Sequence, residues 1–318
     1  MEYPEVTVVI PTLNRPVRVV KAIESLNNQT YKGKIKCVVV DSSQDSQTEE
    51  MIKNKKFSNS NLKVKYIKNN NSFRAIDNWI VGANEFSTEY GKFLCDDDWL
   101  DPTYFEKCMD IFDKNEVDCV ISNICVVKAD GSDIRDYYRI ESGRVGKGKV
   151  IDSYLGIDDI LPVTPTAGLM KSDVLLESFY ESLYHIACTQ KLFGFDFYMS
   201  YYPVFRGEGS FIINESLSFS FAGDDSITLN VKKGKIAYCY FFALLKLIES
   251  VNFKINKKQA SMIRHKLSTF RIRSLFSREY RELNSMNSYR PRLSLIELVF
   301  SQIKKSYIKL YYSVRDRR

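Results

Sequence analysis

The sequence predicts an α/β protein with a mostly parallel sheet flanked by helices, followed by a basic helical C-terminal region. Two observations lead to this prediction. Runs of β-branched residues alternate with stretches of helical periodicity over the first hundred residues, as in parallel strands joined by helices. The charge also changes along the chain: residues 1–231 contain 25 basic and 34 acidic side chains, whereas residues 232–318 contain 21 and 5. We therefore predict two domains, 1–231 and 232–318.

The expected strands are short runs of apolar, mostly β-branched residues that stop at proline or at polar clusters. They lie at Val6–Ile10, Lys36–Val40, Val64–Ile67, Lys92–Cys95, Val117–Val127 and Phe211–Ile213. Ligands of parallel sheets bind beyond the carboxyl ends of the strands. Those ends carry Pro11-Thr12, Asp41-Ser42 and Asp96-Asp97-Asp98.

The expected helices separate these strands and then dominate the basic region. The stretch that begins at Pro16 places Val17, Val20, Ile23 and Leu26 on one face, as an amphipathic helix requires. Glycines at positions 131, 143, 146 and 148 predict a loop region in the middle of the chain. The remaining helices are expected at Thr48–Lys55, Ala75–Phe86, Ala237–Val251, Lys257–Glu282 and Leu293–Val314.

Composition excludes several classes of protein. With 44% hydrophobic residues, 14 Gly and 8 Pro, the chain is neither collagen-like nor disordered. Seven cysteines without a CxxC pair or a Cys/His cluster indicate thiols of a reducing compartment. The most apolar stretch, Tyr238–Ile248, is much shorter than the roughly 20 residues of a membrane span. The first residues do not resemble a signal peptide, so we expect a cytoplasmic protein.

Carboxylates must carry any metal or acid–base chemistry, because the chain has only two histidines. His185 has apolar neighbours and is expected to pack in the core, whereas His265 belongs to the basic region. The triplet Asp96-Asp97-Asp98 directly follows a predicted strand, and its mutual repulsion favours an oxygen-loving divalent cation. The alternative is a solvated acidic turn in which Asp98 or Asp101 caps a helix.

Four segments in the same order resemble the family 2 glycosyltransferases, which are nucleotide-sugar-dependent enzymes of the Rossmann-like GT-A fold. The segments are Val6–Arg15, the strand that ends at Asp41, Asn78-Trp79 with Gly82, and Phe93–Pro102. The resemblance is dense over residues 4–105 and thinner to about residue 230, and the basic region shows none. It implies that residues 1–115 form a nucleotide-sugar-binding half and residues 116–231 an acceptor-side half.

The resemblance also implies roles for the residues that match the family's motifs. Pro11 and Thr12 would line the base, Asp41 would lie near base and ribose, and Asp96 would contact the ribose. The other residues expected at the nucleotide-sugar site are Asn14, Arg15, Ser42 and Asn78. Asp97 and Asp98 would hold Mn²⁺ or Mg²⁺ on the donor diphosphate, Asp98 at least as a support. Trp79 and Trp99 flank this site, either in the core or in contact with the ligand.

The acceptor side resembles the family at Thr164–Gly168, at Met170–Asp173 and at Phe193–Asp196. The last segment implies that Asp196 is the catalytic base of an inverting transfer, because that base must lie across the sugar from the metal. A helix-capping or ion-paired Asp196 is the alternative, with Glu208 and Asp173 as the next candidates for the base.

Two departures from the family pattern bear on the prediction. Ser42 stands where the family often has a second acid that meets uracil, which argues against a UDP donor and leaves thymidine and other nucleotides open. Phe221–Ser226 lacks a histidine that many members carry, and Asp224 or Asp225 could replace it at a metal or phosphate.

The basic region admits three interpretations. Leu293–Tyr312 interleaves apolar residues with Lys304, Lys305 and Lys309, as in a helix that lies on an anionic membrane. A solvated surface or a homo-oligomer contact is the second interpretation. Nucleic-acid binding is the third, and we do not predict it, because no recognition motif supports it.

Together these features predict a hexosyltransferase, metal-dependent and inverting, at the inner face of the plasma membrane. Its acceptor would be a lipid-linked oligosaccharide in bacterial O-antigen or capsule synthesis. The alternatives are a nucleotidyltransferase, although Pro11–Pro16 lacks the glycine of a phosphate loop, and a non-catalytic nucleotide-binding protein with a basic membrane- or nucleic-acid-binding tail.

Overall fold

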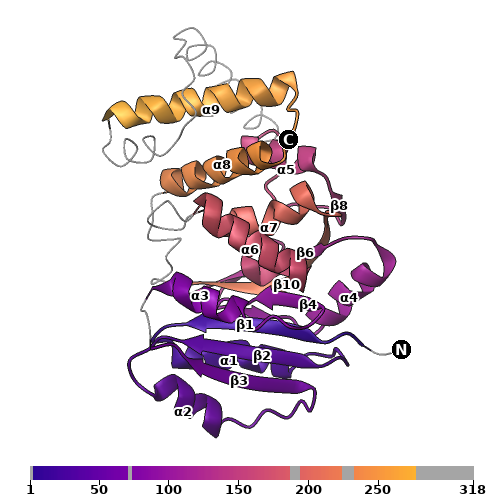
Figure 1. Ribbon diagram of the computed structural model, residues 1–318, viewed down its shortest axis with the longest axis vertical. Coiled ribbons are helices and arrows are strands. Elements are labelled where there is room, and N and C mark those ends of the chain that lie inside the picture. Colours follow the sequence, from indigo (N-terminus) through magenta and orange to yellow (C-terminus); the bar gives the residue numbers. More distant parts are fainter. Residues whose placement is uncertain (1–2, 71–73, 187–193, 224–232, 277–318) are drawn as a thin grey trace. The chain divides into compact units, whose positions relative to one another are not determined.

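The computed structural model describes residues 3–70, 74–186, 194–223 and 233–276. It divides into two compact units, Met1–Val251 and Asn252–Arg318. In the second unit, the described part contains helix α9, Lys257–Phe276. The first unit contains the sheet and the other helices (Figure 1).

The described part of the first unit is built on a ten-stranded mixed sheet with the order β3-β2-β1-β4-β9-β6-β10-β5, to which β7 and β8 pair at the side. Strands β1 to β4 run parallel, β9 is antiparallel to both neighbours, and β6 and β10 are parallel to each other. The strands are β1 (Val6–Thr12), β2 (Ile35–Asp41), β3 (Leu62–Lys68), β4 (Tyr90–Phe93), β5 (Trp99–Leu100), β6 (Cys119–Lys128), β7 (Asp133–Ile134), β8 (Gly143–Val145), β9 (Gly168–Lys171) and β10 (Ser210–Ala222).

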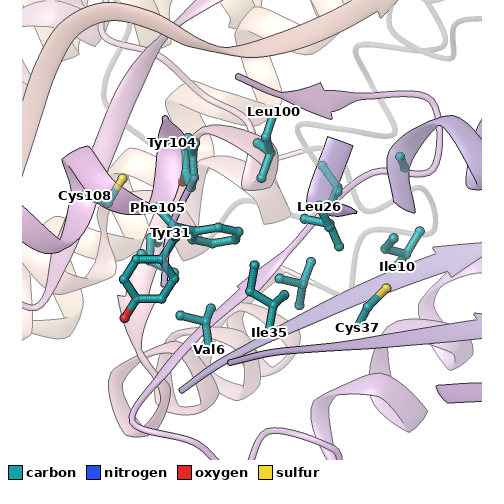
Figure 2. Close-up of a cluster of buried hydrophobic side chains, with 14 of the residues drawn as sticks. Val6, Ile10, Leu26, Tyr31, Ile35, Cys37, Leu100, Tyr104, Phe105 and Cys108 are labelled. Atoms are coloured by element: carbon teal, nitrogen blue, oxygen red, sulfur yellow. The ribbon is translucent and has the colours of Figure 1, made fainter. Parts of the chain in front are cut away.

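Helices cover both faces of this sheet. The helices of the first unit are α1 (Pro16–Asn27), α2 (Gln47–Asn54), α3 (Ala75–Ala83), α4 (Tyr104–Lys114), α5 (Lys147–Leu155), α6 (Ser172–Ile186), α7 (Phe195–Arg206) and α8 (Lys233–Ser250), with a short 3₁₀ helix η1 (Pro165–Ala167). On one face, Val6, Val8 and Ile10 of β1 pack with α1 and α4 in a buried apolar cluster (Figure 2). On the other face α3 approaches so closely that a Cβ on Gly82 would lie 2.3 Å from Val9 Cγ1.

The predicted α/β class is confirmed, and the differences have local causes. Strand β1 continues through Pro11, because β4 pairs with β1 only as far as Val9 and leaves β2 as the neighbour there. The predicted glycine loop is wrong in part: Gly148 lies inside α5, which buries Val150 and Ile151. Strand β10 is longer than predicted because it continues past register shifts beside β6. The predicted helix at Leu293–Val314 lies outside the described residues.

The compact division after Val251 differs from the predicted boundary at residue 232. Helix α8 belongs to the first unit because it packs on α5, α6 and α7. Among the helices within the described ranges, none has the length and apolar character needed to cross a bilayer.

Candidate active site

The carboxyl ends of β1, β2 and β4 meet at one edge of the sheet, and a hydrogen-bond network joins them. Thr12 at the end of β1 donates its hydroxyl to Asp96 Oδ2 at 2.7 Å. Asn78 of α3 donates Nδ2 to the Thr12 carbonyl at 2.8 Å and to Ser42 Oγ at 2.9 Å. Asn69 in turn donates to Asn78 Oδ1 at 2.9 Å. The predicted residues Thr12, Ser42, Asn78 and Asp96 therefore lie together, with Asn78 buried as the connector.

Asp41 is completely buried and organises the loop that follows β2. Its Oδ1 accepts hydrogen bonds from the Ser43 amide at 2.8 Å and hydroxyl at 2.5 Å, and its Oδ2 accepts one from the Tyr66 hydroxyl at 2.8 Å. Ser43 Oγ also accepts from the Asn14 amide at 2.7 Å, and Asn14 has a φ of 56°. Asp41 thus holds the loop that is predicted to lie near the nucleotide base. The sequence did not indicate Ser43 or Tyr66, because both belong to polar or alternating stretches without a motif.

Two arginines of the loop before α1 and of α1 itself contact the acidic triplet. Arg15 Nη1 lies 2.9 Å from Asp96 Oδ1 and 3.2 Å from Asp97 Oδ2, and Arg18 Nη1 lies 3.9 Å from Asp97 Oδ2. Burial raises the pKa of Asp96, while Arg15 and Thr12 lower it. The arrangement places two cations and two carboxylates at the edge where a diphosphate would bind.

Asp98 differs from its two neighbours because its hydrogen-bond donors are neutral groups, whereas Asp96 and Asp97 contact arginines. Thr166 of η1 donates to Oδ2 at 2.6 Å, Ser220 donates to Oδ2 at 3.3 Å, and the Phe221 amide donates to Oδ1 at 3.1 Å. Burial and then the charge of Asp97 raise the pKa of Asp98 to about 7. This geometry favours the supporting role over direct metal ligation. Within the described residues, no group of three or more His, Cys, Asp or Glu side chains could hold a metal.

A buried lysine lies beneath the same junction. Lys92 of β4 donates Nζ to the Thr166 carbonyl at 2.6 Å and lies 3.8 Å from the centroid of the Tyr104 ring. Burial lowers the pKa of Lys92 to about 7. Thr166 therefore links β4 to Asp98. The Thr166 carbonyl also accepts a hydrogen bond from the Ser218 hydroxyl of β10 at 3.3 Å. The sequence offered one signal for this contact, because Lys92 lies within a short strand that was predicted to be buried.

Replacing Thr166 by valine should lower the free energy of unfolding by about 1–3 kcal/mol, because buried Asp98 would lose its shortest hydrogen bond. Thr166→Ser keeps the hydroxyl and should cost clearly less. Urea denaturation of both variants at neutral pH measures the difference. Equal losses would show that the methyl group contributes as much to the junction as the hydroxyl does, which contradicts a dominant role for the hydrogen bond.

Chain direction separates the three candidate bases. Strand β6 runs parallel to β4, since β9 is antiparallel to both, and β10 runs parallel to β6. Glu208 precedes β10 and Asp173 follows β9, so both lie at the amino ends of β10 and β4, the edge opposite Asp96–Asp98. Asp196 lies in the first turn of α7, whose 12 residues span roughly 18 Å before the chain enters β10. Its end of α7 is therefore the one nearer the acidic triplet.

A row of packed aromatic rings leads from the residue before Asp196 to β4. The ring centroids of Phe195 and Trp79 are 6.0 Å apart, and those of Trp79 and Phe93 of β4 are 4.5 Å apart. Asp196 Oδ2 accepts a hydrogen bond from the Tyr240 hydroxyl at 2.6 Å. Burial raises the pKa of Asp196, and the hydrogen bond from Tyr240 opposes that rise.

The remaining predicted residues lie apart from this network. Trp79 packs against the core, whereas Trp99 stacks on Phe219 with Lys21 Nζ 3.1 Å from its ring centroid. His185 stacks on Tyr198 and lies 3.2 Å from Glu181. Phe193, Asp224 and Asp225 lie outside the described residues.

The chain belongs to glycosyl transferase family 2, whose model matches residues 7–176. The resemblance seen in the motifs is thereby confirmed, and the protein is a glycosyltransferase. A similar protein is the GalNAc(5)-diNAcBac-PP-undecaprenol beta-1,3-glucosyltransferase of Campylobacter jejuni, with 26% identity over 253 residues, 78% of this chain and 75% of that protein.

The fold is similar to that of TarS from S. aureus. The structure of TarS 1–349 in complex with UDP superimposes with a TM-score of 0.55 at 12% identity, over 92% of this chain and 94% of that one. The complex of the same fragment with UDP-GlcNAc has a TM-score of 0.52 at 12% identity, over 83% and 80%. At this identity the likeness establishes the fold, and the predicted GT-A architecture is confirmed.

Proposed function

We propose that this enzyme transfers a hexose from a nucleotide-sugar to an acceptor hydroxyl with inversion at the anomeric carbon. What supports the proposal is the position of Asp196 in the first turn of α7, next to Phe195, whose ring packs through Trp79 on β4, the strand that leads to Asp96 and Asp97. An inverting transfer needs a diphosphate site on one side of the sugar and a base on the other. Family membership favours glycosyl transfer over nucleotidyl transfer and over a non-catalytic role.

The diphosphate would lie at Arg15, Arg18 and the carboxylates of Asp96 and Asp97. Asp96 and Asp97 offer oxygen ligands of the kind that Mg²⁺ and Mn²⁺ prefer, and two carboxylates suffice where phosphate oxygens complete the shell. A bound cation supplies charge neutralisation for the departing nucleoside diphosphate. Arg15 holds both carboxylates in place and would turn toward the phosphates when the donor binds.

Asp196 would take the proton of the acceptor hydroxyl as its oxygen attacks the anomeric carbon. The new glycosidic bond forms on the face opposite the breaking bond to the diphosphate, which inverts the configuration. Partial burial suits this role because it raises the pKa of the carboxylate toward the working pH.

The acceptor and donor classes follow from similar proteins. The name of the C. jejuni relative gives an undecaprenol-diphosphate-linked acceptor. We propose a lipid-linked acceptor for this enzyme too, within bacterial polysaccharide synthesis. The TarS complexes contain UDP and UDP-GlcNAc, so a uridine donor is our first choice despite Ser42.

A thermal-shift panel of uridine, thymidine, guanosine and cytidine diphosphates, with and without Mn²⁺, tests the donor site. A ligand that binds the native state raises its stability by about 2.7 kcal/mol at a hundredfold excess over Kd. We expect UDP to raise the melting temperature, and more so with Mn²⁺. A response to no nucleotide would contradict the proposal, and a response to another base would correct the donor.

We also propose that the basic region attaches the enzyme to the inner face of the membrane. Residues 277–318 lie outside the described part of the chain, so the support comes from their sequence and from the lipid-linked substrate of the relative. Each basic residue near an anionic surface contributes about 1 kcal/mol, and salt weakens the effect.

The full chain should therefore float with anionic vesicles at low salt, and at high salt the bound fraction should fall several-fold. Zwitterionic vesicles are the control. Equal binding to both vesicle types would show that charge is not the cause. No binding to either, with a homo-oligomer in solution, would assign the region to assembly instead.

A further inference from the structure

Helix α8 approaches the start of α7 more closely than a side chain would allow. Gly194, the residue before α7, has a φ of 91°, a conformation that favours glycine. A Cβ at this position would lie 2.8 Å from the Cys239 carbonyl oxygen and 3.3 Å from Ala243 Cβ. The backbone of α8 is thus seated directly against the turn that presents Asp196.

Tyr240, the next residue of α8, contacts the proposed base. Its hydroxyl donates to Asp196 Oδ2 at 2.6 Å. The centroid of its ring lies 5.8 Å from that of Phe197, with an interplanar angle of 28°. It lies 6.3 Å from the ring centroid of Tyr154, with an interplanar angle of 73°. Packing on two sides restricts the phenol, so the hydrogen bond restricts the rotation of the carboxylate in turn.

We propose that Tyr240 is a positioning residue of the transfer reaction, whose hydroxyl holds the Asp196 carboxylate in the orientation that receives the acceptor proton. This inference rests on the proposed role of Asp196. It assigns a part in the reaction to a helix that lies beyond residues 7–176, the segment that matches the family model.

The electrostatic surroundings of Asp196 allow a specific test. Burial raises its pKa, whereas Tyr240 and the backbone amides of Gly194, Asp196 and Phe197 lower it. The other ionisable groups that face it are the phenols of Tyr138 on the loop after β7 and Tyr154 on α5. Burial raises the pKa of both phenols and of Tyr240, so all three stay neutral near pH 7. Within the described residues, no ion pair involves Asp196.

The test compares Tyr240→Phe with the parent enzyme over a range of pH. The measured reaction is hydrolysis of the nucleotide-sugar selected by the thermal-shift panel, with water as the acceptor. Loss of a donor to the charged form raises the pKa of a carboxylate, and the base works only when ionised. The acidic limb of the kcat/KM profile should therefore move to higher pH by roughly one unit, which is about a tenfold loss on that limb. Donor affinity, measured by calorimetry, should stay unchanged.

Tyr154→Phe is the matched control, since Tyr154 packs against the same rings but donates its hydroxyl to the Leu161 carbonyl at 2.7 Å. It should lower thermal stability and leave the acidic limb in place. An unmoved limb in Tyr240→Phe, or an equal shift in both variants, would overturn the proposal.

Failure of this inference can be told apart from failure of the proposed function. If Asp196→Asn abolishes turnover while Tyr240→Phe leaves the limb unmoved, the base assignment stands and the positioning role falls. If Asp196→Asn is fully active, the base assignment itself is wrong. Should Tyr240→Phe melt far below the parent, replacement of Tyr240 by 3-fluorotyrosine is the second variant, because it keeps the ring and the hydroxyl and makes the phenol a stronger hydrogen-bond donor. The acidic limb should then move to lower pH, and an unmoved limb would contradict the proposal.

Discussion

Replacing Asp196 by asparagine should reduce the rate of sugar transfer by about 10²–10⁴-fold, the usual range for loss of a general base. The amide keeps the size of the side chain and can still accept a hydrogen bond from Tyr240, so the fold should survive. Calorimetric titration should give an unchanged donor affinity, because the role proposed for Asp196 is toward the acceptor and not the donor. Steady-state kinetics with a saturating donor measure the loss in kcat.

Asp173→Asn is the matched control for this experiment. Asp173 also lies in the first turn of a helix, α6, but at the opposite edge of the sheet. Its replacement should leave kcat within a factor of about two, since it is an exposed side chain far from the acidic triplet. A collapse of donor affinity in Asp196→Asn would instead place Asp196 in the nucleotide site. A large loss in the control would move the base to the other edge.

Asp97→Asn should lower turnover by roughly 10²-fold or more and remove the Mn²⁺-dependent part of nucleotide binding. An amide oxygen is a poorer ligand for a hard cation, and neutralisation of the leaving diphosphate is worth several kcal/mol in the transition state. The parent enzyme in excess EDTA should show a loss of similar size. The measurements are turnover with and without EDTA and nucleotide titration at several Mn²⁺ concentrations.

Asp101→Asn provides the control within the same acidic stretch. Asp101 accepts hydrogen bonds from the amide and hydroxyl of Thr103 at the start of α4, at 2.9 and 2.7 Å. Its replacement should cost stability of about 1 kcal/mol without altering the response to Mn²⁺. Full activity of the parent in EDTA would contradict metal dependence and assign the diphosphate to Arg15 and Arg18 alone.

Local patterns predicted the parts of the fold that are built from neighbouring residues. Strands β1 and β2 are rich in valine and isoleucine, and the polar residues that end or follow β1, β2 and β4 predicted the edge where Thr12, Ser42 and Asp96 meet. Strand β9 was not predicted, because its four residues have no period of their own and are placed by pairing with β4 and β6. Helix α5 was not predicted, because the glycines at its start and just before it indicated a loop.

The candidate site was predicted at the level of motifs but not of contacts. The motif gave Asp98 a metal-binding or supporting role, but it could not show that the distant residues Thr166 and Phe221 hydrogen-bond to this carboxylate. Tyr240 could not be predicted as a partner of Asp196, because its sequence neighbours indicate only an apolar helix. Such contacts depend on how helices pack, which no short pattern contains.

The position of β9 has a consequence for the synthesis of the chain. A ribosome releases β4 and β6 well before Gly168–Lys171, the strand that pairs with both, and before β10, the long partner of β6. Until then both strands carry unpaired backbone edges, which are templates for aggregation. The nascent chain should therefore gain protease resistance only after residue 222 has left the exit tunnel. A fragment that ends at residue 115 or 128 should be insoluble rather than a working nucleotide-binding half.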